Sequence, residues 1–363
     1  MYSLEHRPIS LDTIVGQKGI IREMKKRSLT RDFPEVMIFH GPSGTGKTTL
    51  AYIIAGIINE KNPIEKEGFI DPNPDSISFQ SILKEKFSRD IHFYDASSLN
   101  KEEMQKLENI ASSAPMYDTK KVLIIDEAQE ITNAGKGVAL RLLEKKRKNS
   151  HIILCTMNIG AFDKAVQTRG INYKFKEPNP SEIAGYLFSV VAEEGLLDTV
   201  PEVFLTEGIF SIAENSSGSV REAVQNLERC IMSEIYTPED IIKELGLYTD
   251  SFITDALVAI LNGKSKDIID GIFKDPMSFH LKAAKIVSES EMYKYTGYID
   301  QSWKKKNMER LISSPNFDKI VEVIYNLSRE VYFRESVFKI EMARLFKSVN
   351  QPPVITKPKR MPV

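Results

Sequence analysis

The feature that most limits what this chain can fold into is the run Gly41-Pro42-Ser43-Gly44-Thr45-Gly46-Lys47-Thr48, which matches the pattern G-x-x-x-x-G-K-[ST]. The apolar residues 36–40 before it predict a buried strand, and residues 48–59 after it have helical periodicity. A strand, a glycine-rich loop and a helix in this order form a phosphate-binding loop. Glycines let backbone N–H groups approach phosphate oxygens, and the helix N-terminus adds positive potential. A chance glycine-rich turn is the alternative, and this context disfavours it.

The residues of the loop have different predicted roles. Lys47 is expected to reach the β- and γ-phosphates of a nucleotide, and the hydroxyl of Thr48 is expected to bind Mg²⁺. The other loop residues, together with Thr49, are expected to surround the phosphates. The expected cofactors are therefore ATP and Mg²⁺.

An acidic pair follows a second apolar run. Residues 122–125 are apolar and lead into Asp126 and Glu127, which places both acids at the carboxyl end of a parallel strand, where ligands of α/β sheets bind. Asp126 is expected to hold Mg²⁺, and Glu127 to act as general base toward the attacking water. An acidic turn that merely closes a strand is the alternative. The pair favours hydrolysis over phosphate transfer to a small molecule, because no other segment resembles an acceptor pocket.

Strand and helix patterns alternate along the first half of the chain. Further strands are predicted at residues 91–94, 121–125, 151–155 and 172–175, with helices at 101–112, capped by Asn100, and at 135–146. This alternation predicts an α/β fold with a parallel sheet. After Pro178 only helical patterns occur, over 181–194, 203–214, 219–234, 238–245 and 250–348. Residues 61–90 form a polar insertion, and the tail at 351–363 is expected to be flexible.

Composition restricts the class of protein. The chain has 363 residues, with 49 Lys plus Arg against 50 Asp plus Glu, so it does not coat nucleic acid by bulk charge. No apolar run approaches the roughly 20 residues of a membrane span, and no signal peptide is recognised. Cys155 and Cys230 have no metal-ligand spacing. A cytoplasmic protein without a membrane partner is expected.

Several further motifs resemble one family. Arg7-Pro8, residues 14–17 (IVGQ), the phosphate loop, residues 126–129 (DEAQ), 168–170 (TRG) and 218–222 (GSVRE) have the order and spacing of AAA+ clamp-loader ATPases. The likeness is greatest to the DNA polymerase III gamma/tau type and its phage counterparts, and covers about residues 4–245. It implies a RecA-like ATPase domain over 1–176, a helical lid over 177–246 and a helical oligomerisation collar over 250–350.

The resemblance also implies roles for single residues. Arg7, Val15 and Gly16 match the segment that packs on the adenine and ribose. Thr156 or Asn158 matches the polar sensor that orients the attacking water, although Met157 occupies that position by count. Arg169 matches the arginine finger that completes a neighbouring subunit's site. Arg221 matches a second sensor of the γ-phosphate.

The implied partners are a sliding clamp, primer–template DNA and the other subunits of a homo- or hetero-oligomer, expected to be a pentamer. Lys101, Asn133 and Lys136 stand at predicted helix starts that suit contacts with DNA phosphates; ordinary solvated helix starts are the alternative. Met116 and Tyr117 are candidates for contact with the clamp, or else core residues before a strand.

The chain departs from the family pattern at three places. Gly170 stands where the family usually has cysteine, and Gln129 stands where a histidine or an acid is often found. Residues 61–90 contain no cysteine, so the zinc module of the gamma/tau type is not expected here. Because the catalytic residues are retained, a working ATPase that loads clamps is predicted. Another AAA+ DNA machine, such as a branch-migration motor or a helicase loader, and a nucleotide-binding scaffold with little turnover are the alternatives.

Overall fold

The computed structural model describes residues 2–84, 90–145, 148–245, 250–263, 276–299, 305–328 and 344–345. The chain divides into two compact units. The first comprises Met1–Val200 with Ser216–Ser233, and the second Pro201–Asn215 with Glu234–Val363. The division into ATPase domain, lid and collar stays a prediction. The tail at 351–363 lies outside the described residues.

A parallel sheet forms the centre of the first unit. Its strand order is β4 (Ile91–Asp95), β5 (Lys121–Asp126), β6 (Ser150–Thr156), β1 (Val36–His40) and β7 (Ile171–Lys174), and all neighbouring pairs are parallel. These strands lie where the apolar runs predict them, and the predicted α/β fold is confirmed. Because β6 lies between β1 and β5, the residues that follow these three strands meet at one edge of the sheet.

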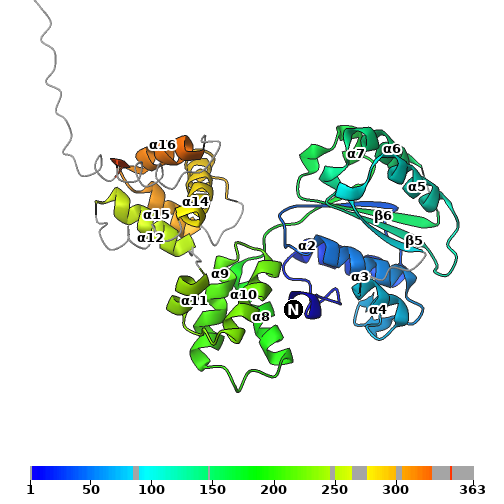
Figure 1. Cartoon of the computed structure of the whole chain (residues 1–363), viewed down its shortest axis with the longest axis horizontal. Coiled ribbons are helices and arrows are strands. Elements are labelled where there is room, and N and C mark those ends of the chain that lie inside the picture. Colours follow the sequence, from blue (N-terminus) through cyan, green and yellow to red (C-terminus); the bar gives the residue numbers. More distant parts are fainter. Residues whose placement is uncertain are drawn as a thin grey trace, which may run out of the picture. The chain divides into compact units, whose positions relative to one another are not determined.

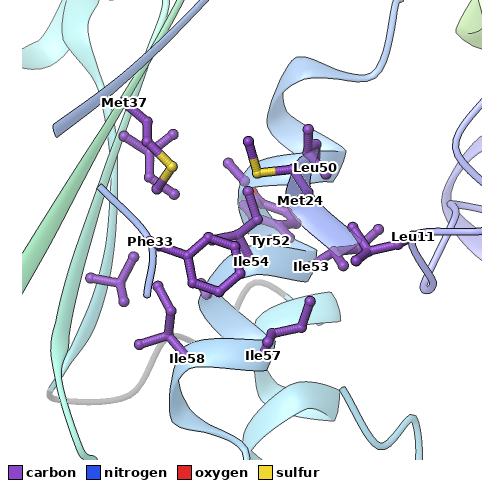
Figure 2. Packing of buried hydrophobic residues seen from close by; sticks show 14 of the residues in the cluster. Leu11, Met24, Phe33, Met37, Leu50, Tyr52, Ile53, Ile54, Ile57 and Ile58 are labelled. Carbon is purple, nitrogen blue, oxygen red and sulfur yellow. The ribbon is translucent and has the colours of Figure 1, made fainter. Parts of the chain in front are cut away.

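Helices cover both faces of this sheet. In Figure 1, α2 (Lys18–Thr30) and α3 (Lys47–Asn59) lie on one face, and α5 (Lys101–Ser112), α6 (Asn133–Glu144) and α7 (Lys164–Gln167) on the other. Two separate hydrophobic clusters fill the two interfaces. Figure 2 shows apolar side chains of α3 gathered with Met24 of α2 and Met37 of β1. This packing fixes the start of α3, and therefore the phosphate loop, against the end of β1.

The polar insertion has secondary structure of its own. It forms a two-stranded hairpin, β2 (Ile64–Lys66) and β3 (Phe69–Asp71), and helix α4 (Ile77–Leu83), all of which the sequence patterns had not indicated. Phe79 of α4 lies so close to α3 that a Cβ at Gly56 would come within 2.6 Å of its ring. The insertion thus covers the outer side of α3, which explains why the residues from Leu50 to Asn59 are buried on every side.

The remaining described elements are helical. The first unit also contains α1 (Tyr2–Glu5), α8 (Pro180–Glu193) and α10 (Val220–Met232). The second contains a π-helical turn (Phe204–Gly208) and helices α9 (Ile209–Asn215), α11 (Pro238–Leu245), α12 (Asp250–Leu261), α14 (Pro276–Thr296), α15 (Lys305–Ile312) and α16 (Phe317–Ser328). A third hydrophobic cluster joins α12, α14, α15 and α16. Among the described residues, no helix has the length and apolar character to cross a bilayer.

Candidate functional site

A cavity of about 270 Å³ opens at the carboxyl edge of the sheet in the first unit. It brings together most of the residues predicted to bind nucleotide, although they come from distant segments of the chain. Its lining comprises Ser3, His6, Arg7, Pro8, Ile14, Val15, Ser43, Gly44, Thr45, Gly46, Lys47, Thr48, Thr49, Asp95, Asp126, Glu127, Tyr186, Val220, Arg221 and Val224. Basic groups, acidic groups and a few apolar side chains thus share one hollow, as a nucleotide with its metal ion requires.

The phosphate loop is shaped by its glycines. Gly41, Gly44 and Gly46 all have positive φ, of 142°, 72° and 95°, which L side chains rarely adopt. A Cβ at Gly41 would lie 2.3 Å from the carbonyl oxygen of Phe175. The pattern of glycines therefore follows from both backbone conformation and close packing.

Lys47 lies inside the loop that it follows. Its Nζ donates to the carbonyl oxygens of Gly41 and Pro42, each at 2.8 Å, and the residue is 8% exposed. Burial lowers the pKa of this ammonium group, with the nearby carboxylates of Glu127 and Asp126 opposing that shift. A buried cation whose hydrogen bonds go to carbonyl oxygens can donate instead to phosphate oxygens, which are stronger partners.

The predicted metal ligands are in direct contact. Thr48 donates its hydroxyl to Oδ2 of Asp126 at 2.8 Å, although the two residues are 78 positions apart. Burial raises the pKa of the Asp126 carboxyl, while the bonds from Thr48 and from the backbone of Glu127 oppose the shift. Oxygen ligands at this spacing suit Mg²⁺, which binds through one or two protein oxygens plus phosphates and water. The residues present therefore fit the expected ion.

The acid that follows Asp126 has an unusual backbone. Glu127 has φ 46°, in the left-handed region, and its N–H donates to Oδ1 of Asp126 at 3.0 Å. Its Oε2 accepts from Nε2 of Gln129 at 2.6 Å. Non-glycine residues in this conformation carry strain that the surroundings must hold. Glu127 lines the cavity, as a general base would have to.

The segment predicted to contact adenine and ribose is held from two sides. The side-chain amide of Gln17 donates to the carbonyl of Lys176 at 2.6 Å and accepts from its N–H at 3.1 Å. On the other side, Asp71 of the insertion accepts from the backbone of Leu11 at 2.9 Å and from the hydroxyl of Ser10 at 2.5 Å. Ile14 and Val15, which lie between these two anchors, line the cavity, whereas Gly16 does not.

The start of α10 contacts the phosphate loop. The N–H of Val220 donates to the carbonyl of Gly44 at 3.0 Å. Ser219 caps the helix by accepting from Glu222, and its Oγ lies 2.1 Å from the position of a Cβ at Gly44. Arg221 thereby lines the same cavity as Lys47.

The two candidates for the first sensor differ in their contacts. Thr156 ends β6, is fully buried, and donates its hydroxyl to Oε1 of Gln129 at 2.7 Å. Asn158 accepts from the N–H of Gly160 at 2.8 Å and caps a short turn, Ile159–Ala161. Met157 is 49% exposed. Thr156 is thus connected to the acid pair through Gln129, whereas the side chain of Asn158 serves its own turn; neither lines the cavity.

Arg169 lies apart from the cavity. Its side chain is 48% exposed, and Nη2 donates to Oε1 of Glu144 at 2.9 Å. Packing explains why the neighbouring position 170 is a glycine, because a Cβ there would lie 2.7 Å from Cγ1 of Val36. The glycine in place of the usual cysteine is therefore a local adaptation to β1.

Sequence reasoning missed several residues of the cavity. Tyr186 of α8 donates its hydroxyl to the carbonyl of His6, which ties α8 to the N-terminal segment. His6 itself contacts Glu193 at 3.0 Å and Glu194 at 2.7 Å. Asp95 ends β4 opposite Asp126. Only Asp95 carried a readable signal, since it is an acid at the end of a predicted strand.

Comparison with known proteins finds one family model and several sequence relatives. A family model described as DNA polymerase III, delta subunit, matches residues 16–179. Replication factor C subunit 3 of Arabidopsis thaliana is 27% identical over 70% of this chain and 73% of its own length. DNA polymerase III subunit gamma of Buchnera aphidicola is 26% identical over 72% of this chain and 69% of its own length. Protein STICHEL-like 2 of Arabidopsis thaliana is 27% identical over 74% of this chain, which spans only 30% of that protein.

Among solved structures, the Holliday junction branch migration motor RuvB of Thermotoga maritima aligns with a TM-score of 0.46 and 18% identity, over 76% of this chain and 80% of that one. A likeness of this extent does not separate one branch of the fold class from another. The sequence relatives do make this distinction. The chain is related to the AAA+ ATPase subunits of clamp loaders, of the DNA polymerase III and replication factor C types, and the resemblance inferred from its motifs is confirmed.

Proposed function

We propose that this protein is an ATP-hydrolysing subunit of a clamp loader, which opens a ring-shaped sliding clamp and places it on primer–template DNA during replication. The observation that carries the proposal is the convergence of Lys47, Thr48, Asp126, Glu127 and Arg221 on one cavity. The relatives named above support the same class of function.

Each group in the cavity has a physical role in this proposal. Lys47 and the loop N–H groups bind the phosphates, and Thr48 and Asp126 hold the Mg²⁺ ion, which neutralises developing charge on the phosphates. Glu127 takes a proton from the attacking water. Arg221, at the start of α10 and next to the loop, contacts the γ-phosphate. The apolar side chains of Ile14, Val15 and Val224 are available to the adenine.

Arg169 acts on a neighbouring subunit in this proposal. It is exposed and lies outside the cavity of its own chain, as a residue that completes a second subunit's site must. A guanidinium group that reaches a neighbour's γ-phosphate stabilises the transition state. Each nucleotide would then lie between two subunits of an assembly, with five subunits in all.

DNA is expected to meet the start of α6 in preference to the start of α5. Lys101 begins α5, but Asn100 already accepts from two N–H groups there, and Glu102 and Glu103 occupy the first turn. The first turn of α6 contains no acid and includes Lys136, and its cap Thr132 accepts from one N–H group, that of Gly135. Phosphates are favoured by free N–H groups and disfavoured by carboxylates. Asn133 begins the same helix, so α6 offers the better phosphate contact of the two.

Met116 and Tyr117 offer an apolar surface for the clamp. They are 67% and 62% exposed, which excludes the alternative that they are core residues. Asp90, which is fully buried, accepts from the backbone N–H groups of Met116, Tyr117 and Asp118 at 2.6 to 3.0 Å. The loop is therefore held in place while its side chains stay exposed, as a docking contact requires. Replacing both by serine should abolish clamp binding, whereas Ile77→Ser, at another exposed apolar residue, should not.

Measurement of ATP turnover tests the whole proposal. With the cognate clamp, the partner subunits and primed DNA, hydrolysis should exceed the rate observed with the clamp or the DNA alone. No stimulation by the two together would contradict clamp loading. A single-turnover experiment on the same assembly that shows no hydrolysis would favour a nucleotide-binding scaffold.

In the described parts of residues 250–345 every regular element is a helix, which favours a collar over the winged helix expected of a branch-migration motor.

A further inference from the structure

Gln129 joins the acid pair to the end of the next strand. It lies in the short turn Ala128–Glu130 directly after Glu127. Its Nε2 donates to Oε2 of Glu127 at 2.6 Å. Its Oε1 accepts from the hydroxyl of Thr156 at 2.7 Å and from the N–H of Met157 at 3.2 Å. One side chain thus connects β5 with β6 across 27 residues of sequence.

The chemistry of its partners fixes which way this amide faces. The N–H of Met157 can only donate, so it requires the oxygen of Gln129. The carboxylate of Glu127 can only accept, so it requires the nitrogen. Both requirements are met by one orientation and neither by its flip. The choice between amide O and N is therefore decided by the hydrogen-bond network.

The amide of Gln129 also restrains Glu127, whose own backbone conformation is unfavourable. Glu127 is in the left-handed region, with φ 46°, so contacts from its surroundings must hold it there. Gln129 supplies one such contact to the carboxylate itself. Its other end is anchored on Thr156, which is fully buried at the end of a central strand. The carboxylate is thus positioned from the rigid sheet, not only from its own loop.

Neither of the side chains often found at this position makes both bonds as the amide does. A carboxylate at position 129 could not donate to Glu127 and would repel it. A histidine could donate from one ring nitrogen and accept at the other, but only when neutral. Protonation would place a donor opposite the N–H of Met157. Glutamine makes both bonds without titrating.

We propose that Gln129 is a positioning residue, which orients the carboxylate of the general base Glu127 from the end of β6. The inference rests on the proposed function. It explains why this chain can lack the histidine or acid often found at this position: the amide keeps the connection between the base and Thr156. Any movement of Thr156 would change the orientation of Glu127.

Turnover and nucleotide affinity of single variants test this role in the full chain, with the clamp, partner subunits and primed DNA described above. Gln129→Leu should lower kcat by about tenfold or more, as expected when a hydrogen bond that aligns a catalytic group is lost. The affinity for a non-hydrolysable ATP analogue should change by less than about twofold, because the amide acts on the base and not on phosphate binding.

Gln105→Leu is the matched control. Gln105 also places its amide between a carboxylate, Glu108 at 3.1 Å, and a donor, Arg141 at 3.4 Å, but on the exposed side of α5. It should change neither kcat nor affinity. If wild-type protein turns over and Gln129→Leu does not slow it, the positioning role is wrong and the proposed function stands. Absence of turnover in the wild type contradicts the proposed function itself.

Two further variants separate positioning from a merely structural role. Gln129→His should give a kcat that falls as the pH drops below about 6.5, the ordinary pKa of histidine, whereas the wild type should show no such added step. Thr156→Val should lower kcat in the same way as Gln129→Leu, and Thr156→Ser, which keeps the hydroxyl, should restore it. A Gln129→His profile parallel to the wild type, or no difference between the two Thr156 variants, would overturn the inference.

Discussion

The cavity at the carboxyl edge of the sheet and the surroundings of Arg169 differ in how firmly they hold their charged side chains and in how far they expose them. The cavity gathers Lys47, Asp126 and Arg221 from segments far apart in the chain, and hydrogen bonds hold Lys47, Asp126 and the start of α10 in place. Arg169 lies outside it, half exposed, with an ion pair to Glu144. One chain therefore gathers the residues predicted to bind ATP and Mg²⁺ in one cavity, whereas the predicted arginine finger lies outside that cavity. The difference suits the proposal that one subunit is enough for nucleotide binding, whereas hydrolysis needs two.

Loss of Lys47 should have the largest effect on the cavity. Lys47→Ala removes a buried cation and several charge-assisted bonds to phosphate, so affinity for ATP should fall by roughly 100-fold or more. Binding of a fluorescent ATP analogue to the full chain measures this directly. Lys106→Ala, at an exposed lysine of α5, serves as the control. Equal affinity in the two variants would show that the cavity is not the nucleotide site.

Replacement of Arg169 should separate the two regions. Arg169→Ala should leave ATP affinity unchanged, because the residue is outside its own cavity, and lower hydrolysis in the assembly by about 10³- to 10⁵-fold. Arg169→Lys should recover little of the loss, since lysine lacks the planar fork. The measurements are analogue binding and single-turnover hydrolysis. A loss of binding, or hydrolysis that continues at the wild-type rate, would break the comparison.

The contact between the phosphate loop and α10 tests whether the cavity acts as a unit. In Gly44→Ala, the new Cβ meets Oγ of Ser219 at 2.1 Å, which should push Arg221 away from the loop and weaken ATP binding by about tenfold. Gly68→Ala is matched in backbone, with φ 81° against 72°, but has open space around its Cβ. Equal ATP affinity in the two variants would mean that α10 contributes nothing to the cavity.

The sequence predicted those parts of the site that depend on regular structure. The loop at 41–48, the acids after residue 125 and the strands themselves follow from apolar runs and glycine positions, and parallel strands bring their carboxyl ends together. Side-chain links across the sheet could not be predicted, because they depend on register and rotamer. The bond from Thr156 to Gln129 is of this kind, as is the hold of Asp71 on residues 10 and 11. The exposure of Met116 likewise depends on Asp90, 26 residues earlier.

The ion pair between Arg169 and Glu144 should have the smallest effect. Both partners are at least 40% exposed, and pairs of this kind contribute about 0–1 kcal/mol. Glu144 ends α6, whose first turn is the proposed contact with DNA. If this pair holds Arg169 back until DNA is bound, Glu144→Gln should raise hydrolysis without DNA by about two- to fivefold and leave the DNA-stimulated rate unchanged. Glu202→Gln, at another exposed acid, should alter neither rate. If Glu144→Gln raised the hydrolysis rate equally with and without DNA, Glu144 would have no part in the response to DNA. Arg169 would then be the only residue of this exposed pair with a role in hydrolysis.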